Sequence, residues 1–148
     1  MHKNVAANGF ASFGVLVNGA PSNIQFATVQ PYSPGIFAVT HASSGTLVDG
    51  NNPATVGERL VIYANGLGPV NGPMVTGQPA SSTALEPTTV QATAKMNGTT
   101  ATVEFSGLTP GFIGLYQVNL IVPAGVSGTA FLDLGSGGLT ASVNFPVK

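Results

Sequence analysis

The sequence predicts an all-β fold, a sandwich of antiparallel sheets built from short strands. Charged residues make up only 6% of the 148 residues, whereas helices usually carry Glu, Lys and Arg on their solvent-facing sides. Asn-Gly pairs recur along the chain, and such a pair between alternating apolar runs is a strong hairpin signal, because both turn residues can adopt positive φ. These pairs begin at Asn8, Asn18, Asn65, Asn71 and Asn97.

Two of these pairs predict the register of a hairpin. Around Asn97-Gly98, a two-residue turn gives one apolar and one polar face. Its expected apolar pairs are Met96/Thr99, Ala94/Ala101, Ala92/Val103 and Val90/Phe105, and its expected polar pairs are Lys95/Thr100, Thr93/Thr102 and Gln91/Glu104. Around Asn18-Gly19, the same treatment pairs Val17/Ala20, Phe13/Ile24 and Ala11/Phe26, with Ser12 and Gln25 facing outward.

Alternation of apolar and polar residues predicts the remaining strands. In residues 58–65, for example, Leu60, Ile62 and Ala64 share one face. No stretch has a helical period. The other expected strands are residues 115–122, 129–134 and 139–147, with shorter ones at 35–40 and 46–48.

The two ends of the chain resemble each other. Residues 13–26 align, with one gap, to residues 131–145, and both read as a strand, a glycine turn and a strand ending in Phe. Either this is a repeat, or any two hairpins of this composition look alike. If it is a repeat, residues 1–31 are an N-terminal hairpin and linker that ends a preceding domain, and residues 32–148 form one complete sandwich domain.

Charge and composition limit the partners. The four Lys and Arg residues are scattered and the net charge is −1, so no basic surface is expected for nucleic acid or an anionic membrane. No apolar run reaches the ~20 residues of a membrane span. With no cysteine, disulfides, thiolate zinc sites and thiol catalysis are excluded.

Six blocks in order carry a family resemblance: residues 32–37 (YSPGIF), 49–54 (DGNNPA), 57–68 (GERLVIYANGLG), 77–80 (GQPA), 109–119 (TPGFIGLYQVN) and 122–125 (VPAG). Together they resemble an uncharacterised C-terminal immunoglobulin-like domain family of Solibacter and other acidobacteria. The resemblance implies an immunoglobulin-like antiparallel β-sandwich in a large secreted or cell-surface bacterial protein, beside other β-domains. It implies no catalytic residues and no cofactor. His41 departs from the family pattern.

Candidate catalytic residues are few. His41 with Ser43, Ser44 and Asp49 has the side chains of a triad, but all four fall in one Gly/Ser-rich region without a nucleophile elbow. A solvated loop is the expected structure there, and we expect no enzyme. Tyr116, near the start of a strand, is expected to hydrogen-bond a loop backbone, as in a tyrosine corner.

Two binding sites are conceivable from the residue types. Asp49, Asn51 and Asn52 supply hard oxygens suited to calcium, although turns of this composition are more often held by their own backbone hydrogen bonds. Tyr32 and Phe112, both in loops, are the candidate exposed aromatics for stacking on a sugar. The alternative for this pair is that they plug the ends of the sandwich.

The sequence therefore predicts a non-catalytic structural or interaction module, an adhesive unit or spacer of a secreted or cell-surface protein. Its expected partners are neighbouring β-sandwich domains, a second copy, or polysaccharide. One alternative is a carbohydrate-binding module of a secreted hydrolase. The other is a self-assembling extracellular fibre subunit, in which residues 4–30 add a strand to a neighbour's open edge.

Overall fold

The computed structural model describes residues 9–75 and 77–148 and divides into two compact units, Met1–Pro31 and Tyr32–Lys148. The division falls at the residues where the sequence analysis places a domain boundary. All regular structure in the described residues is β, and every strand pair is antiparallel. The all-β prediction is therefore confirmed.

The first unit is a hairpin, which we call the N-terminal hairpin (residues 10–28). At its open end, β1 (Phe10–Phe13) pairs with β4 (Gln25–Thr28). At its tip, β2 (Leu16–Val17) pairs with β3 (Ala20–Pro21) around Asn18-Gly19. Asn18 and Gly19 have φ of 50° and 80°, as a two-residue hairpin turn requires.

The predicted register of this hairpin is correct only at its tip. Val17 faces Ala20, but Phe13 faces Gln25 and Ala11 faces Ala27, so the predicted Phe13/Ile24 and Ala11/Phe26 pairs are wrong by one residue. The register shifts between the Val15–Ser22 hydrogen bonds and the Phe13–Gln25 pair. In this interval the returning strand has one residue more than the outgoing strand. Such a bulge exchanges the faces on which later side chains fall.

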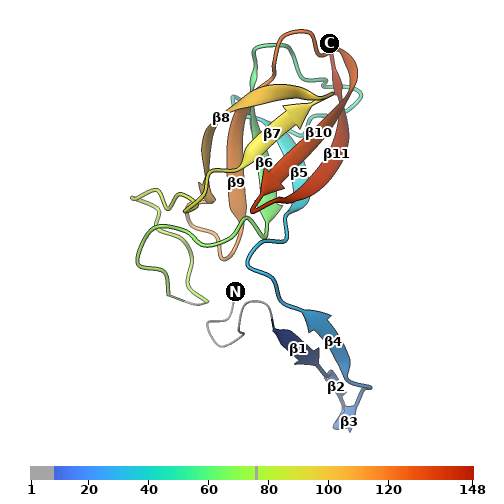
Figure 1. Cartoon of the computed structure of the whole chain (residues 1–148), viewed down its shortest axis with the longest axis vertical. Helices are drawn as coiled ribbons and strands as arrows, with labels where there is room; N and C mark the ends of the chain where they lie inside the picture. Colours follow the sequence, from blue (N-terminus) through green and yellow to red (C-terminus); the bar gives the residue numbers. More distant parts are fainter. Residues whose placement is uncertain (1–8, 76) are drawn as a thin grey trace. The chain divides into compact units, whose positions relative to one another are not determined.

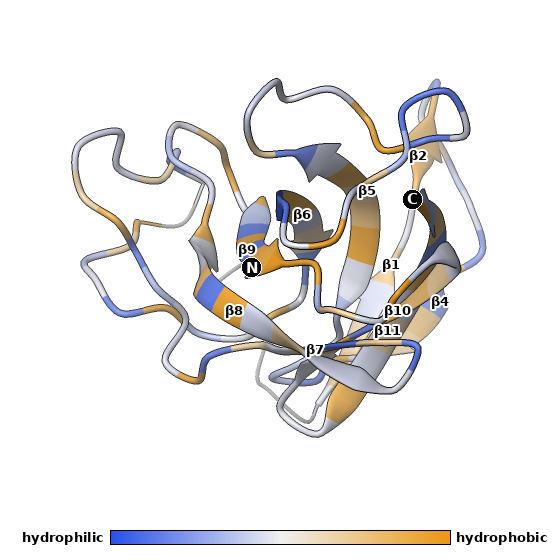
Figure 2. Cartoon of the chain, turned by 90° about the horizontal axis from the view of Figure 1, so that it is seen from above, coloured by the Kyte–Doolittle hydropathy of each residue, from blue (hydrophilic) through white to orange (hydrophobic). Residues whose placement is uncertain are grey.

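The second unit is one seven-stranded sheet in the order β11-β10-β7-β8-β9-β6-β5. The strands follow one another around the domain (Figures 1 and 2), and β11 comes back against β5, so the sheet nearly closes. The strands are β5 (Gly35–His41), β6 (Arg59–Asn65), β7 (Thr93–Met96), β8 (Thr99–Leu108), β9 (Tyr116–Ile121), β10 (Gly128–Ser136) and β11 (Leu139–Val147).

Figure 1 shows β7, β10 and β11 in front of β5, β6 and β9. Both groups of strands contribute side chains to the buried core. The predicted alternation supplies that core: Leu60, Ile62 and Ala64 of β6 are fully buried, and Val118 and Leu120 of β9 face the same interior. Burial of these apolar side chains is the main stabilising contribution.

The predicted hairpin at Asn97-Gly98 forms with the expected register at Ala94–Ala101, Lys95–Thr100 and Met96–Thr99. The further predicted pairs, Ala92 with Val103 and Val90 with Phe105, are absent from the β7–β8 pairing. Val90 and Ala92 precede the start of β7 at Thr93, and β8 pairs with β9 from Thr102 onward. The strand expected at residues 46–48 is reduced to a single bridge between Thr40 and Leu47.

Candidate functional site

The candidate calcium residues lie in the connection between β5 and β6. The backbone N–H groups of Asn51 and Asn52 donate to Asp49 Oδ1 at 2.8 and 2.9 Å. Asn52 Nδ2 donates to Thr46 Oγ1 at 3.0 Å. Asp49 therefore closes a turn with one of its carboxylate oxygens, which is the common role of such residues. Whether calcium binds here stays a prediction.

Across the described residues, 9–75 and 77–148, there is no group of three or more His, Cys, Asp or Glu side chains that could hold a metal ion. The same residues include no helix that is long and apolar enough to span a membrane.

His41 is buried, contrary to the solvated loop expected from the sequence. It ends β5 and is only 6% exposed. Its Nδ1 lies 2.5 Å from Glu58 Oε1 and its Nε2 lies 3.1 Å from the carbonyl oxygen of Asn52. Both ring nitrogens are thus engaged by groups other than Ser43, Ser44 or Asp49, and the triad written from the sequence does not assemble.

The contacts of His41 favour its charged form. Carbonyl and carboxylate oxygens are hydrogen-bond acceptors, and the imidazolium form is the one that can donate from both ring nitrogens. The hydrogen bond with Glu58 is the main cause that raises the pKa of His41 above its ordinary value of 6.5. Glu58 Oε2 also accepts the N–H of Thr55 at 2.9 Å. This cluster fastens the β5–β6 connection.

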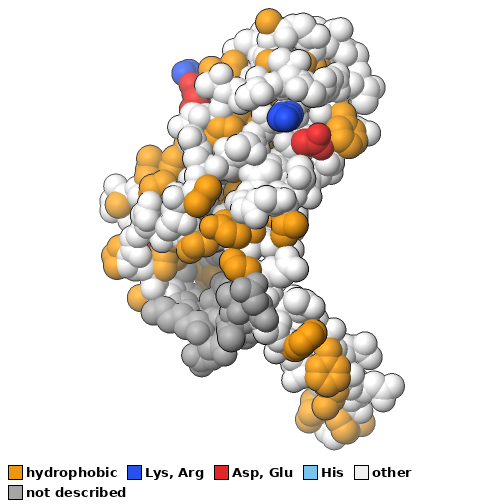
Figure 3. All heavy atoms as spheres, in the orientation of Figure 1, with side chains coloured by type: hydrophobic (Ala, Val, Ile, Leu, Met, Phe, Trp, Pro, Cys, Tyr) orange, Lys and Arg blue, Asp and Glu red, His pale blue; other side chains and the backbone are white. Residues whose placement is uncertain are grey.

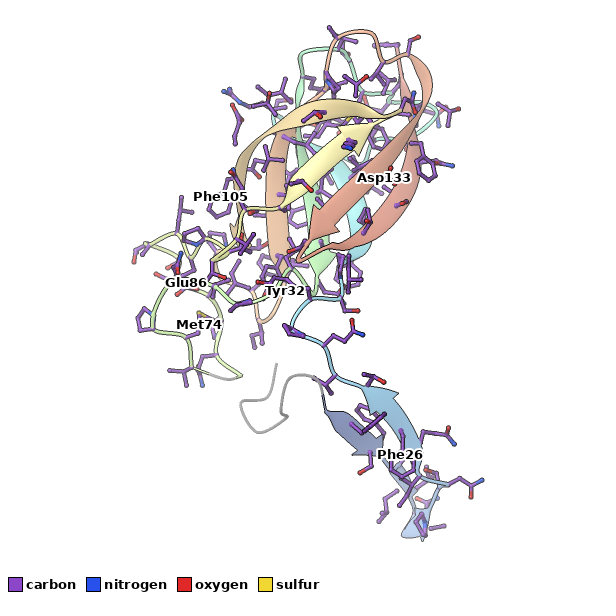
Figure 4. The ribbon with its side chains drawn as sticks, in the orientation of Figure 1. Phe26, Tyr32, Met74, Glu86, Phe105 and Asp133 are labelled. Carbon is purple, nitrogen blue, oxygen red and sulfur yellow. The ribbon has the colours of Figure 1, made fainter. Side chains whose placement is uncertain are left out.

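Tyr32 is wedged against two glycines of the domain. Its ring packs on the backbone at Gly68 and at Gly137, where an added Cβ would lie 2.2 and 2.1 Å from ring atoms. Tyr32 is half-buried and lies beside the lower ends of the strands in Figure 4. Its ring fills space at this end of the domain, as the plug alternative describes.

Phe112 has different surroundings. It is 55% exposed in the connection between β8 and β9. Its backbone is held to Ala80, whose N–H donates to the Phe112 carbonyl at 2.9 Å. Phe37 on β5 and Phe131 on β10 are also exposed, at 65% and 47%. The sequence analysis did not select these two, because alternation alone does not tell which face of a strand stays in solvent.

Tyr116 behaves as expected from the sequence. Its hydroxyl donates to the carbonyl oxygen of Gly68 at 2.5 Å, and burial raises the pKa of this phenol. The bond joins the start of β9 to the connection that follows β6. It has a structural role at the same end of the domain as Tyr32.

The sequence did not indicate the surroundings of three acidic residues. Glu58 binds His41, and Glu104 forms a two-point ion pair with Arg59 at 2.7 and 2.9 Å, across β9. Glu86 is only 7% exposed, and among the described residues its Oε2 has no hydrogen-bond partner. These arrangements depend on pairing between distant strands, so no local motif could have revealed them.

Several large apolar side chains of the N-terminal hairpin are exposed. Figure 3 shows hydrophobic side chains along it, and residues 9–31 contain no charged side chain. Exposure reaches 79% for Phe10, 73% for Phe26 and 72% for Leu16.

Comparisons with known proteins found no matching family model, no matching curated protein and no matching solved structure.

Proposed function

We propose that Tyr32–Lys148 is an immunoglobulin-like sandwich that serves as a non-catalytic structural and interaction module of a secreted or cell-surface protein. The observation that carries the proposal is the strand order. Constant-type immunoglobulin domains have strands A, B, E and D in one sheet and C, F and G in the other. If β5 to β11 are strands A to G, the orders β5-β6-β9-β8 and β7-β10-β11 are the same two sheets.

The continuous pairing of all seven strands is compatible with this proposal. Among the named strands, the short β7–β8 pairing joins the two groups, and these two strands correspond to C and D. At the opposite edges, strands A and G would be β5 and β11, which lie against each other. Tyr116 differs from an immunoglobulin tyrosine corner, because it stands at the start of β9, the counterpart of strand E rather than F.

The candidate site also favours a structural role. His41 and Tyr116 are tied to Glu58, Asn52 and Gly68 by hydrogen bonds that hold connections in place. An open hollow beside Glu58 is lined by Ala42, Ser43, Gly57, Glu58 and Arg59, but the imidazole next to it has no free nitrogen to act as a base. The location and the acidobacterial family resemblance remain part of the proposal, supported by the sequence blocks.

The test combines affinity electrophoresis in neutral polysaccharide gels with light scattering on the full chain. For a structural module, we expect no retardation by any polysaccharide and no concentration-dependent oligomer. The Phe112→Ala variant is the matched control for polysaccharide binding, because Phe112 is exposed and lies outside the core.

Either alternative would give a different result. Retardation that Phe112→Ala or Phe37→Ala abolishes would replace this proposal with a carbohydrate-binding module. Oligomers that grow with concentration would replace it with the self-assembling subunit. Gel retardation and light scattering are measured on the same protein sample, so the two alternatives can be compared directly.

A further inference from the structure

We propose that the N-terminal hairpin is the last hairpin of a second sandwich of the same kind, carried before it in the polypeptide, and that its Phe26 face completes that domain's core. The inference rests on the proposed sandwich fold and names the partner of the apolar surface. The partner is a set of five strands equivalent to β5–β9. The cross-strand register of the two hairpins, which the sequence alignment did not use, supports this assignment.

The N-terminal hairpin and the β10–β11 hairpin have the same register. The alignment of residues 13–26 with 131–145 predicts that Phe13–Gln25 is equivalent to Phe131–Asn144, and extending it without a further gap covers the other three pairs of β1 and β4, which share this one register. The equivalent pairs are Phe10–Thr28 with Gly128–Val147, Ala11–Ala27 with Thr129–Pro146, Ser12–Phe26 with Ala130–Phe145, and Phe13–Gln25 with Phe131–Asn144. The one-residue slip that overturned the simple prediction is the shift that produces this agreement.

The turns agree as well. Asn18-Gly19 and Gly137-Gly138 are both two-residue turns with positive φ at both positions. The two hairpins differ by one residue in the first arm, and the irregularity around Gly14 accommodates it. A single-residue difference near the tip leaves the register of the pairs at the open end of the hairpin unchanged.

The two hairpins differ in burial at an equivalent position where both have Phe. Phe145 on β11 is 5% exposed and belongs to the core, whereas its equivalent Phe26 is 73% exposed. Figure 4 labels Phe26 on the ribbon of β4. On the other face, Phe131 and its equivalent Phe13 are both exposed, at 47% and 56%. By this equivalence, the Phe26 face corresponds to the core-facing side of β10–β11 and the Phe13 face to its solvent-facing side.

Backbone pairing makes the same distinction. β10 pairs with β11 on one side and with β7 on the other. Within the described residues, β1 pairs with β4 alone, so its outer edge has donors and acceptors free for a strand equivalent to β7. An isolated two-stranded hairpin is at best marginally stable in water, and a partner sheet removes both the open edge and the exposed Phe26.

The test supplies the proposed partner in the same polypeptide. Residues 32–127, which end just before β10, are joined directly to residue 10 of the chain, so that residues 10–28 stand where β10 and β11 would follow. Hydrogen exchange of the β1 and β4 amides is then compared with the original full chain. We expect at least about 100-fold slower exchange in the extended chain, because these amides become part of a cooperative core.

Two substitutions in the extended chain give the matched control. Phe26→Asp should abolish the protection of β1 and β4, whereas Phe13→Asp should leave it in place, since the equivalent Phe131 is solvent-facing. The original Tyr32–Lys148 domain, still present downstream, is the internal reference. Loss of protection in its own β10 and β11 would count against the proposed sandwich, independently of the hairpin.

Two results would overturn the inference. One is unchanged exchange of β1 and β4 in the extended chain while the downstream domain stays protected. The other is protection of β1 and β4 in the original chain that increases with concentration, because the hairpin would then pair with a second copy. Equal effects of Phe13→Asp and Phe26→Asp would also contradict the assigned face.

Discussion

At the residue scale, buried polar side chains hold together connections that the sequence analysis treated as loops. Tyr116 is the clearest case, because its hydroxyl is the donor to the Gly68 carbonyl. Removing one partner of a buried hydrogen bond leaves the other unsatisfied.

We therefore expect Tyr116→Phe to lower the free energy of unfolding by about 1–2 kcal/mol. Urea denaturation measures the change. Tyr63→Phe is the control, because no hydrogen bond from the Tyr63 hydroxyl is found among the described residues, and it should change the stability by less than about 0.5 kcal/mol. Equal losses for both variants would show that the ring, not the hydroxyl, carries the effect.

His41 makes stability depend on pH. Its pKa is raised in the folded state, mainly by the hydrogen bond with Glu58, so the folded protein binds the proton more tightly than the unfolded chain. The resulting stabilisation is fully present below the unfolded-state pKa, near 6.5, and is lost as pH rises through the folded-state pKa.

Denaturation midpoints from about pH 5.5 to pH 9 should therefore fall across this window in the original chain. In His41→Gln the fall should vanish, and in Glu58→Gln it should shrink, because the main cause of the raised pKa is gone. A midpoint that rises with pH in the original chain would contradict the imidazolium assignment.

The sequence could not have revealed the His41 cluster. Glu58 and Asn52 are distant from His41 along the chain, and they meet it only when β5 and β6 pair and the connection folds back. The Asp49 turn was foreseeable, because an Asx residue bonding its own next N–H groups is a local event. Local contacts could be predicted here, whereas contacts made by strand pairing could not.

At the element scale, hairpin registers were predicted from their turns and remain correct only while both strands stay in one pairing. The β7–β8 register is as predicted from Met96 to Ala94 and ends where β8 leaves for β9. In the N-terminal hairpin, the predicted register ends at the bulge beyond Val15. Turn chemistry fixes the first pairs, and tertiary pairing decides the rest.

The β10–β11 turn gives a prediction at this scale. Gly137 has φ of 58°, and an added Cβ would lie 2.1 Å from the Tyr32 ring. We expect Gly137→Ala to lower the free energy of unfolding by about 2–4 kcal/mol, from backbone strain together with the collision.

A double-mutant cycle separates these two causes. With Tyr32→Ala in place, Gly137→Ala should cost only about 1 kcal/mol, the part due to positive φ. Gly50→Ala is the control, since an added Cβ there meets no atom within 4 Å and its φ is not positive. The same cost with and without Tyr32 would mean that the ring simply moves aside.

At the scale of the whole molecule, the class of the fold followed from composition and turns, but the strand order did not. Low charge and recurrent Asn-Gly predicted short antiparallel strands. The order in which β9 comes between β6 and β8 depends on long-range pairing, for which a single sequence holds no local signal. The family blocks implied the sandwich, and the boundary at Pro31 was predicted from the likeness between residues 13–26 and 131–145.

The two units make separate contributions to stability. Every member of the buried core, from Val39 to Val147, belongs to Tyr32–Lys148, while the large apolar side chains of the N-terminal hairpin are exposed. We therefore expect a chain that starts at Tyr32 to unfold with the same free energy as the full chain, within about 0.5 kcal/mol.

Because the deleted surface is apolar, binding of a hydrophobic dye and adhesion to hydrophobic resin should both fall. Denaturation of the two chains side by side measures the first effect and dye fluorescence the second. A loss of several kcal/mol on deletion would mean that the hairpin packs on its own domain, and the face of Phe26 would then already have its partner.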